Sequence, residues 1–150
     1  MKISIRRAKL ADIDELDMLL TDLFTIEADF KPNTDKQKQG LKLLINSDTT
    51  CLLVAENNGK VIGMCSVQTL ISTAEGGPVG LLEDMIIAKG YRGKGVGELL
   101  LTEMEKWSAD HGLLRLQLLA DKNNLPALQF YEKCFWESTS LVCWRKILHT

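Results

Sequence analysis

Apolar and polar positions in the first third of the chain change from a two-residue period to a helical one. Residues 2–7 alternate apolar with charged side chains, which predicts a strand. Apolar residues then recur at helical spacing over 13–23 behind Asp12, which predicts a helix that this acid caps. Residues 35–46 predict a second helix, and residues 25–34 predict a loop or a broken helix before it.

The middle of the chain predicts three strands. Residues 51–56 and 61–71 are rich in apolar side chains and flank an Asn-Gly pair, which favours the positive φ of a tight hairpin. Residues 79–88 form a third apolar run that only Glu83 and Asp84 interrupt. Such a run is typical of a central strand that is covered on both faces.

Helix and strand patterns alternate in the remaining sequence. We expect a helix up to Gly112, a strand over 113–120, a helix over 124–133 and a last strand over 141–148. The order is β-α-α-β-β-β-α-β-α-β, so we expect an α/β fold with a mixed sheet covered by helices, in a single domain over 1–150.

Composition and charge exclude several classes of protein. The chain is 45% hydrophobic and 25% charged, as globular proteins are. A net charge of −2 argues against a nucleic-acid-binding protein. No apolar run is long enough to cross a membrane, and the N-terminal residues lack the apolar stretch of a secretory signal. We therefore expect a cytoplasmic protein with neither nucleic acid nor membrane as a partner.

Cysteine and histidine are too few and too scattered for a zinc site or a histidine-dependent hydrolase. The four cysteines form no Cys-x-x-Cys pair, and the chain has only two histidines. Three of the cysteines lie in apolar strand patterns, where a reduced core thiol is the simplest interpretation. We expect no bound metal.

A glycine-rich basic segment follows the apolar strand predicted over 79–88 and leads into a helix. It reads Arg92-Gly93-Lys94-Gly95-Val96-Gly97. A helix N-terminus has unpaired N–H groups, and glycines let an anion approach the backbone. Arg92 and Lys94 add attraction for phosphate. The segment predicts a phosphate site, although a simple Gly-rich turn has the same composition.

Two other glycine-rich phosphate loops do not match this segment. In the P-loop, Gly-Lys is followed by Ser or Thr, whereas Gly95 stands here, so no hydroxyl is present to hold magnesium. In the dinucleotide-binding loop the glycines follow the first strand at Gly-x-Gly-x-x-Gly spacing, but here they follow the fourth predicted strand at a shorter spacing.

The segment resembles the phosphate loop of the GNAT N-acyltransferase superfamily. That family has Arg or Gln, two residues, Gly, one residue, then Gly or Ala, matched here by Arg92, Gly95 and Gly97. A second block of the family matches Asn124-x-x-Ala127-x-x-Phe130-Tyr131, and there Cys134 stands where the family usually has Gly. A helix and a strand separate the two blocks, as in the family, and the resemblance spans nearly the whole chain.

The resemblance implies a GNAT-like fold, with a mostly antiparallel central sheet, and an N-acetyltransferase. The acetyl group would pass from acetyl-CoA to a primary amine of a small molecule or protein, by direct attack in a ternary complex. The backbone of the glycine-rich segment would hold the CoA pyrophosphate, and an N–H near Ile86 or Ile87 would face the oxyanion. The expected cofactor contacts are Met85, Ile86, Ile87, Arg92, Gly93, Lys94, Gly95, Val96, Gly97 and Asn124.

Two residues are candidates for proton transfer. Glu83 lies in an apolar strand, where burial would raise its pKa toward that of a base working at neutral pH. Asp84 is its substitute, although strand alternation predicts that it points to the opposite face. Tyr131 resembles the family's general acid, which protonates the CoA thiolate.

The acceptor site and the partners are less determined by the sequence. Glu27 and Asp29, with Glu75 and Glu83, would form an acidic mouth for a cationic amine, although each acid alone also fits a solvated surface. The alternative to an enzyme is a non-catalytic acyl-CoA-binding module that regulates a partner. An exposed last strand would also permit a homodimer.

Overall fold

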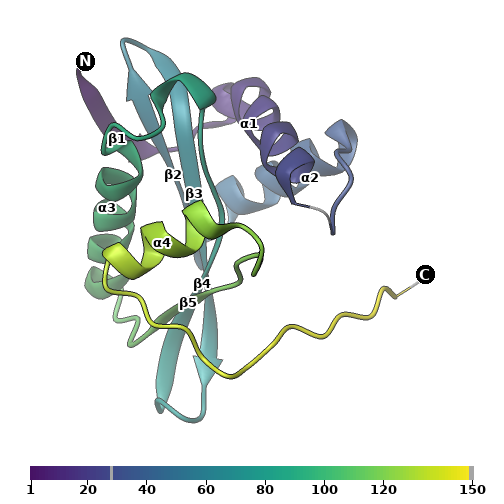
Figure 1. Ribbon diagram of the computed structural model, residues 1–150, viewed down its shortest axis with the longest axis vertical. Coiled ribbons are helices and arrows are strands. Elements are labelled where there is room, and N and C mark those ends of the chain that lie inside the picture. The colour runs from purple at the N-terminus through teal and green to yellow at the C-terminus, as the bar shows by residue number, and fades with distance from the viewer. Residues whose placement is uncertain (28, 149–150) are drawn as a thin grey trace. The chain divides into compact units, whose positions relative to one another are not determined.

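The computed structural model describes residues 1–27 and 29–148 (Figure 1). The chain divides into two compact units, Met1–Leu118 and Leu119–Thr150, which are described separately. Over the part of the chain that the structure describes, no helix combines the length and the apolar character needed to cross a membrane.

The first unit contains a five-stranded mixed sheet. In sheet order its strands are β1 (Ile3–Arg7), β2 (Thr50–Asn57), β3 (Lys60–Ser72), β4 (Gly77–Ile87) and β5 (Leu116–Leu118). The pairs β1–β2, β2–β3 and β3–β4 are antiparallel, and β5 runs parallel to β4. The sheet is mixed and mostly antiparallel, as expected, although β5 is shorter than the apolar pattern over 113–120 predicted.

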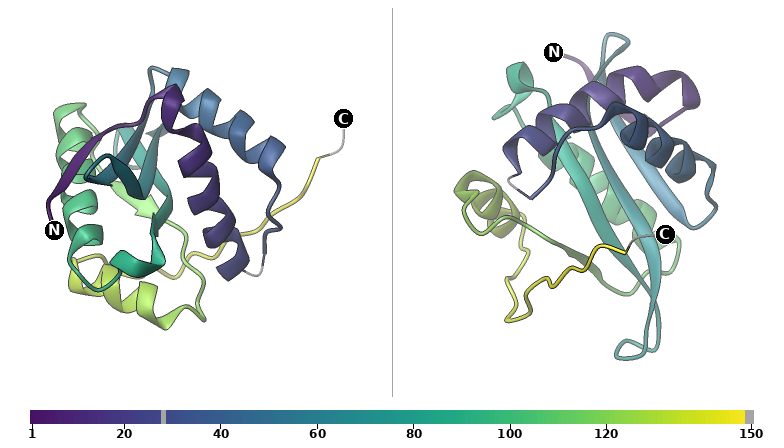
Figure 2. Two further views of the ribbon diagram at one scale, coloured as in Figure 1. Left: turned by 90° about the horizontal axis from the view of Figure 1, so that it is seen from above. Right: turned by 90° about the vertical axis from the view of Figure 1, so that its right-hand side faces the viewer.

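Helices cover both faces of this sheet. Helices α1 (Ile13–Ile26) and α2 (Thr34–Asn46) lie on one face, and α3 (Val96–Asp110) lies on the other (Figure 2). The apolar stripes of α1 and α2 meet the sheet in one core, where Leu16, Leu41 and Met64 are almost completely buried. The helical spacing of the apolar residues therefore predicted the buried face correctly.

The first two helices begin differently, and the cap predicted for the first of them does not form. Asn33 caps α2, since its side chain accepts a hydrogen bond from the Lys36 N–H at 3.1 Å. Asp12 does not cap α1 with its side chain. It accepts from the Lys9 N–H at 2.7 Å, at a 3₁₀ turn (Leu10–Asp12), and it pairs with Arg6 at 2.8 Å. The strand β1 thus supplies the cation that this buried acid requires.

The second unit contains helix α4 (Leu125–Lys133), which confirms the helix expected over 124–133. The last strand expected over 141–148 is wrong, because the structure has neither helix nor strand there. Alternating apolar and polar residues favour an extended chain, but a strand also needs a hydrogen-bonded neighbour, which the pattern does not specify.

Candidate functional site

A β-bulge interrupts β4 at its two acids. Between the paired residues Ser66–Glu83 and Met64–Ile86, β4 has one residue more than β3. Asp84 has a φ of 56°, in the left-handed region, which Asp and Asn tolerate better than most other residues. The bulge interrupts the regular strand alternation at Asp84, and both acids line one pocket. The expectation that their side chains point to opposite faces of the strand stays a prediction.

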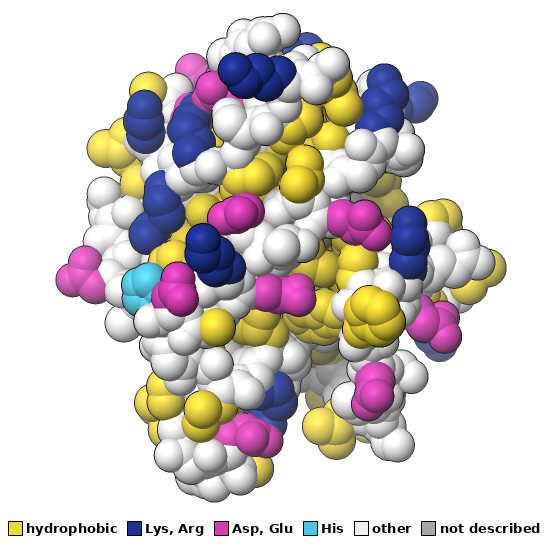
Figure 3. Space-filling view, turned by 90° about the vertical axis from the view of Figure 1, so that its left-hand side faces the viewer, with side chains coloured by type: hydrophobic (Ala, Val, Ile, Leu, Met, Phe, Trp, Pro, Cys, Tyr) yellow, Lys and Arg dark blue, Asp and Glu magenta, His cyan; other side chains and the backbone are white. Residues whose placement is uncertain are grey.

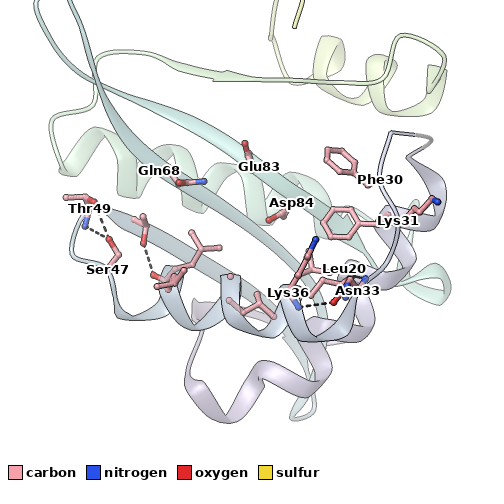
Figure 4. A pocket seen from close by; sticks show the side chains of 17 residues that line it. Leu20, Phe30, Lys31, Asn33, Lys36, Ser47, Thr49, Gln68, Glu83 and Asp84 are labelled. Atoms are coloured by element: carbon pink, nitrogen blue, oxygen red, sulfur yellow. Dashed lines mark hydrogen bonds between the residues drawn. The ribbon is translucent and has the colours of Figure 1, made fainter. Parts of the chain in front are cut away.

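This pocket lies in the first unit, between β3–β4 and the α1–α2 region, and has a volume of about 730 Å³. Figure 4 shows the Asp84 carboxylate on the side of β4 toward α2, and the Glu83 carboxylate farther from α2. Lys36 extends from α2 into the same space, whereas Lys31 points away from it (Figure 4). The pocket therefore presents its acids on the sheet side and a cation on the helix side.

The surroundings of Asp84 make it a weak acid. Burial, together with the neighbouring carboxylates of Glu83 and Glu27, raises the pKa of Asp84 from its ordinary 3.8 to about 7. Burial also raises the pKa of Glu83. An acid with a pKa near neutrality can accept a proton and release it again at physiological pH. The sequence named Glu83 as the candidate base with Asp84 as its substitute, and both acids line this pocket.

The acidic mouth expected from the sequence is only partly assembled. Glu83 lines the pocket, and Glu27 lies close enough to Asp84 to raise its pKa, but neither Glu27 nor Asp29 is among the residues that line it. Glu75 lies near the β3–β4 turn, where it pairs with Arg115 at 3.5 Å. The proton-accepting end of the pocket therefore consists of the two consecutive acids of β4.

The glycine-rich segment connects β4 to α3 as expected. Gly93 and Gly95 have φ values of 72° and 82°, and Gly95 is the N-cap of α3. These conformations favour glycine, and a Cβ at either position would meet no atom within 4 Å. The backbone on this side is therefore open to an anion, and the first N–H groups of α3 have no partner within the helix. The segment thus offers the open backbone and the helix N–H groups that an anion site requires.

The two cations of this segment differ in their contacts. The Arg92 Nε donates a hydrogen bond to the Ile87 carbonyl oxygen at 2.8 Å, which ties the segment to the end of β4. The Lys94 ammonium lies 5.9 Å from the centre of the Tyr91 ring. Arg92 thus has a scaffolding contact that its sequence interpretation as a phosphate ligand did not include.

One edge of β4 is open along the stretch that contains the bulge. The ladder with β5 ends at the pair Leu82–Leu118, so from Glu83 to Ile87 the described residues give β4 no strand neighbour on that side. Met85, Ile86 and Ile87, the expected contacts of the acyl-CoA arm, lie in this stretch. The sequence alone could not show where the two strands part.

The second unit carries the other two predicted residues. The Asn124 side chain accepts a hydrogen bond from the Ala127 N–H at 3.3 Å and so caps α4. Tyr131 lies on α4, and the centre of its ring is 5.3 Å from the centre of the Phe130 ring and 5.9 Å from that of the Trp136 ring. The local fold thus gives Asn124 its capping role and places Tyr131 in an aromatic group.

The turn after α4 corrects the interpretation of Cys134. Cys134 has a φ of −87°, which any residue adopts, whereas Phe135 has a φ of 68°. The position that favours glycine is therefore 135, one residue later than the sequence comparison assumed. Cys134 needs no glycine-like freedom, and Phe135 carries the strain instead.

The described residues contain no cluster of metal ligands, and the face drawn in Figure 3 has no large patch of a single charge sign. Within residues 1–27 and 29–148, no group of three or more His, Cys, Asp or Glu side chains could hold a metal ion. Acidic and basic side chains are interspersed over the face drawn in Figure 3. The pocket acids and the open helix N-terminus are thus the features of the first unit that suit chemistry on a charged ligand.

Sequence reasoning missed the part of the pocket that α2 and the preceding residues supply. Phe24, Phe30, Gly40 and Leu43 all line it. An isolated glycine inside a helical pattern was the available signal, because it costs helix stability unless space is needed there.

Comparisons with known proteins agree with this arrangement. The model of the Acetyltransferase (GNAT) family matches residues 14–135. Aminoglycoside N(6')-acetyltransferase type 1 of Stenotrophomonas maltophilia is 25% identical over 115 residues, 74% of this chain and 75% of that protein. Streptothricin acetyltransferase of Escherichia coli is 36% identical over 53 residues, 35% of this chain, and this chain spans only 30% of its length.

A solved structure shows the same fold. AAC(6')-Iy, in complex with the bisubstrate analogue CoA-S-monomethyl-acetylneamine, has a TM-score of 0.82 at 16% identity, covering 99% of this chain and all of that one. At this identity the likeness concerns the fold. The family match covers most of the sequence and includes both the glycine-rich segment and the acids of β4. The chain belongs to the GNAT acetyltransferase family.

Proposed function

We propose that the protein transfers an acetyl group from acetyl-CoA to the primary amine of a small molecule or protein. The family uses acetyl-CoA as its acyl donor, and relatives named for aminoglycosides and streptothricin favour a small-molecule amine. The observation that carries the proposal is the end of β4, where two acids line a pocket and the glycine-rich segment then leads into the N-terminus of α3.

The donor would bind along the open end of β4. The N–H groups of Gly93 to Gly97 and the start of α3 would hold the pyrophosphate, and the backbone of Met85 to Ile87 would contact the arm. When bound, acetyl-CoA supplies an activated acyl group as a thioester. A backbone N–H at Ile86 or Ile87 would stabilise the oxyanion that forms when the amine attacks.

Proton transfer would involve three side chains. An acid of the pair Glu83–Asp84 takes the proton that the attacking nitrogen must lose. The position of Asp84 on the α2 side of β4 and its pKa of about 7 favour Asp84 as the residue that takes this proton directly. If Glu83 were the base instead, the proton would reach it through water. As the C–S bond breaks, Tyr131 returns a proton to the leaving sulfur. This role rests on the resemblance of the block around it.

Both units would act as one acetyltransferase domain over residues 1–150. The family match extends from residue 14 to residue 135 and therefore crosses the boundary at Leu118. The alternative is an acyl-CoA-binding module without turnover. The retention of two pocket acids and Tyr131 favours the enzyme, since binding alone needs none of them.

Thiol release from acetyl-CoA in the presence of an amine panel tests the proposal. If Asp84 is the base, we expect Asp84→Asn to lower kcat at pH 7 by about 10²–10⁴-fold, and if Glu83 is the base, we expect this loss in Glu83→Gln. Glu75→Gln is the matched control, because Glu75 does not line the pocket. Acetyl-CoA binding without thiol release for any amine would favour the binding module. Unchanged kcat in both acid variants would overturn the assignment of the base.

A further inference from the structure

A glycine in the middle of α2 leaves part of the acceptor pocket open. Gly40 lies at the seventh position of Thr34–Asn46 and lines the pocket. A Cβ built at this position would meet no atom within 4 Å outside its own helix, so the surrounding structure would accept a side chain. Its φ is not in the region that favours glycine. Neither backbone conformation nor a clash therefore explains the glycine at position 40, although glycine is an unfavourable residue inside a helix.

Apolar side chains surround this open space. The lining includes Leu20, Phe24, Phe30, Leu41, Leu43 and Leu44. The Phe24 and Phe30 rings lie 5.3 Å apart. Phe30 and Leu43 remain 45% and 67% exposed, although both lie at the pocket. The apolar part of a ligand would remove this surface from water, and this burial is the main source of affinity for apolar groups.

The charges of the lining limit the number of amines. The lining contains two acids, Glu83 and Asp84, both on β4, and Lys36 extends into the same space, whereas Lys31 points away from it. One ammonium finds its counter-charge at the acids. The further ammonium groups of a polycation would be repelled by Lys36.

We propose that the acceptor is an amine with a single positive charge and an apolar, ring-sized body, and that Gly40 leaves the room for this body. The amine lies at the acids of β4, and the body lies against α2 and the Phe24–Phe30 pair. Gly40 is then a specificity-determining residue. This inference rests on the proposed acetyl transfer and goes beyond it by naming the class of acceptor.

Ethylamine and phenethylamine form the matched test pair, because they share the aminoethyl group and differ by one phenyl ring. With acetyl-CoA as donor, we expect the wild type to have a kcat/KM about tenfold or more higher for phenethylamine. Spermidine, a polycation, should be a poorer acceptor than phenethylamine.

Gly40→Leu fills the space in question. We expect it to lower kcat/KM for phenethylamine by about tenfold or more, with little change for ethylamine and no change in the KM for acetyl-CoA. Gly40→Ala is a milder variant that should raise the thermal midpoint by about 2–4 °C while reducing the preference for the ring. Gln39→Leu is the control, since it adds the same side chain to α2 outside the pocket lining.

Two results would overturn the inference while leaving acetyl transfer intact. One is turnover in which spermidine or ethylamine exceeds phenethylamine. The other is a Gly40→Leu variant that affects both amines equally. Calorimetric titration of the CoA-saturated protein with phenethylamine gives a reading independent of turnover, in which wild-type binding that Gly40→Leu abolishes supports the inference and equal or absent binding contradicts it. Failure of acetyl-CoA itself to bind would instead refute the proposed function.

Discussion

Replacing Asp84 by Asn should make the protein more stable at neutral and alkaline pH. Asp84 lies at a bulge with a φ of 56°, which Asn tolerates as well as Asp, and the two side chains have the same size. The substitution therefore removes a buried charge with little change of shape. Stability and activity are expected to change in opposite directions, because the same charge is proposed to accept the proton of the amine.

The size of the effect follows from the pKa. In the folded protein the pKa of Asp84 is about 7, against an ordinary value of 3.8 that we take for the unfolded chain. As the pH rises, the unfolded chain loses the proton first, so the free energy of unfolding falls between about pH 4 and pH 7 and is then constant. The total loss is at most about 4 kcal/mol, at 1.36 kcal/mol for each unit of pKa difference.

Urea unfolding of the wild type and Asp84→Asn at a series of pH values measures this effect. The charged groups that act on Asp84 are Glu83 of β4 and Glu27 at the end of α1, and Lys36 of α2 extends into the same pocket. We expect the variant to be more stable at pH 8, by up to about 4 kcal/mol, and the difference to shrink toward pH 5. A difference that is absent, or that has the same size at pH 5 and pH 8, would refute the reasoning.

Three further substitutions test the local structure by chemical denaturation. Gly80→Ala should destabilise by about 1–3 kcal/mol, because the added Cβ would lie 2.6 Å from Leu116 and 2.7 Å from Val67 where β4 meets β5; an unchanged stability would mean that β5 moves freely. Phe135→Gly should stabilise by about 1 kcal/mol through relief of its φ of 68°, whereas Cys134→Gly should not. Asn33→Ala should cost about 1 kcal/mol through loss of the α2 cap, and a cost near zero would show that the cap contributes nothing.

Periodicity predicted most of the fold, since each pattern reports which face of an element is buried. Most residues of the apolar stripes of α1 and α2 and of the apolar runs of β2, β3 and β4 lie in the core, whereas Leu70 and Ile71 near the end of β3 are exposed. The run over 141–148 did not become a strand, and β5 covers only Leu116–Leu118. Strand pairing depends on a distant partner, and a local pattern does not contain that information.

In the candidate site, too, one part was predictable from the sequence and another was not. The glycine-rich segment was predictable because its chemistry is contiguous and its glycines take the expected positive φ values. The bulge that places both acids along one pocket was not predictable, because a bulge depends on how β4 pairs with β3. The α2 wall with Gly40 depends on tertiary packing between segments far apart in the sequence.

Isothermal titration with acetyl-CoA tests the central claim most directly. The wild type should bind acetyl-CoA, and Gly95→Glu should abolish binding, because it places a bulky anion where the pyrophosphate would lie. Gly112→Glu is the matched control: Gly112 follows the other end of α3, its φ of 76° gives a similar strain, and an added Cβ also meets no atom within 4 Å. Binding by the wild type and Gly112→Glu but not by Gly95→Glu is the predicted result. No binding by the wild type, or equal binding by all three proteins, would contradict the account.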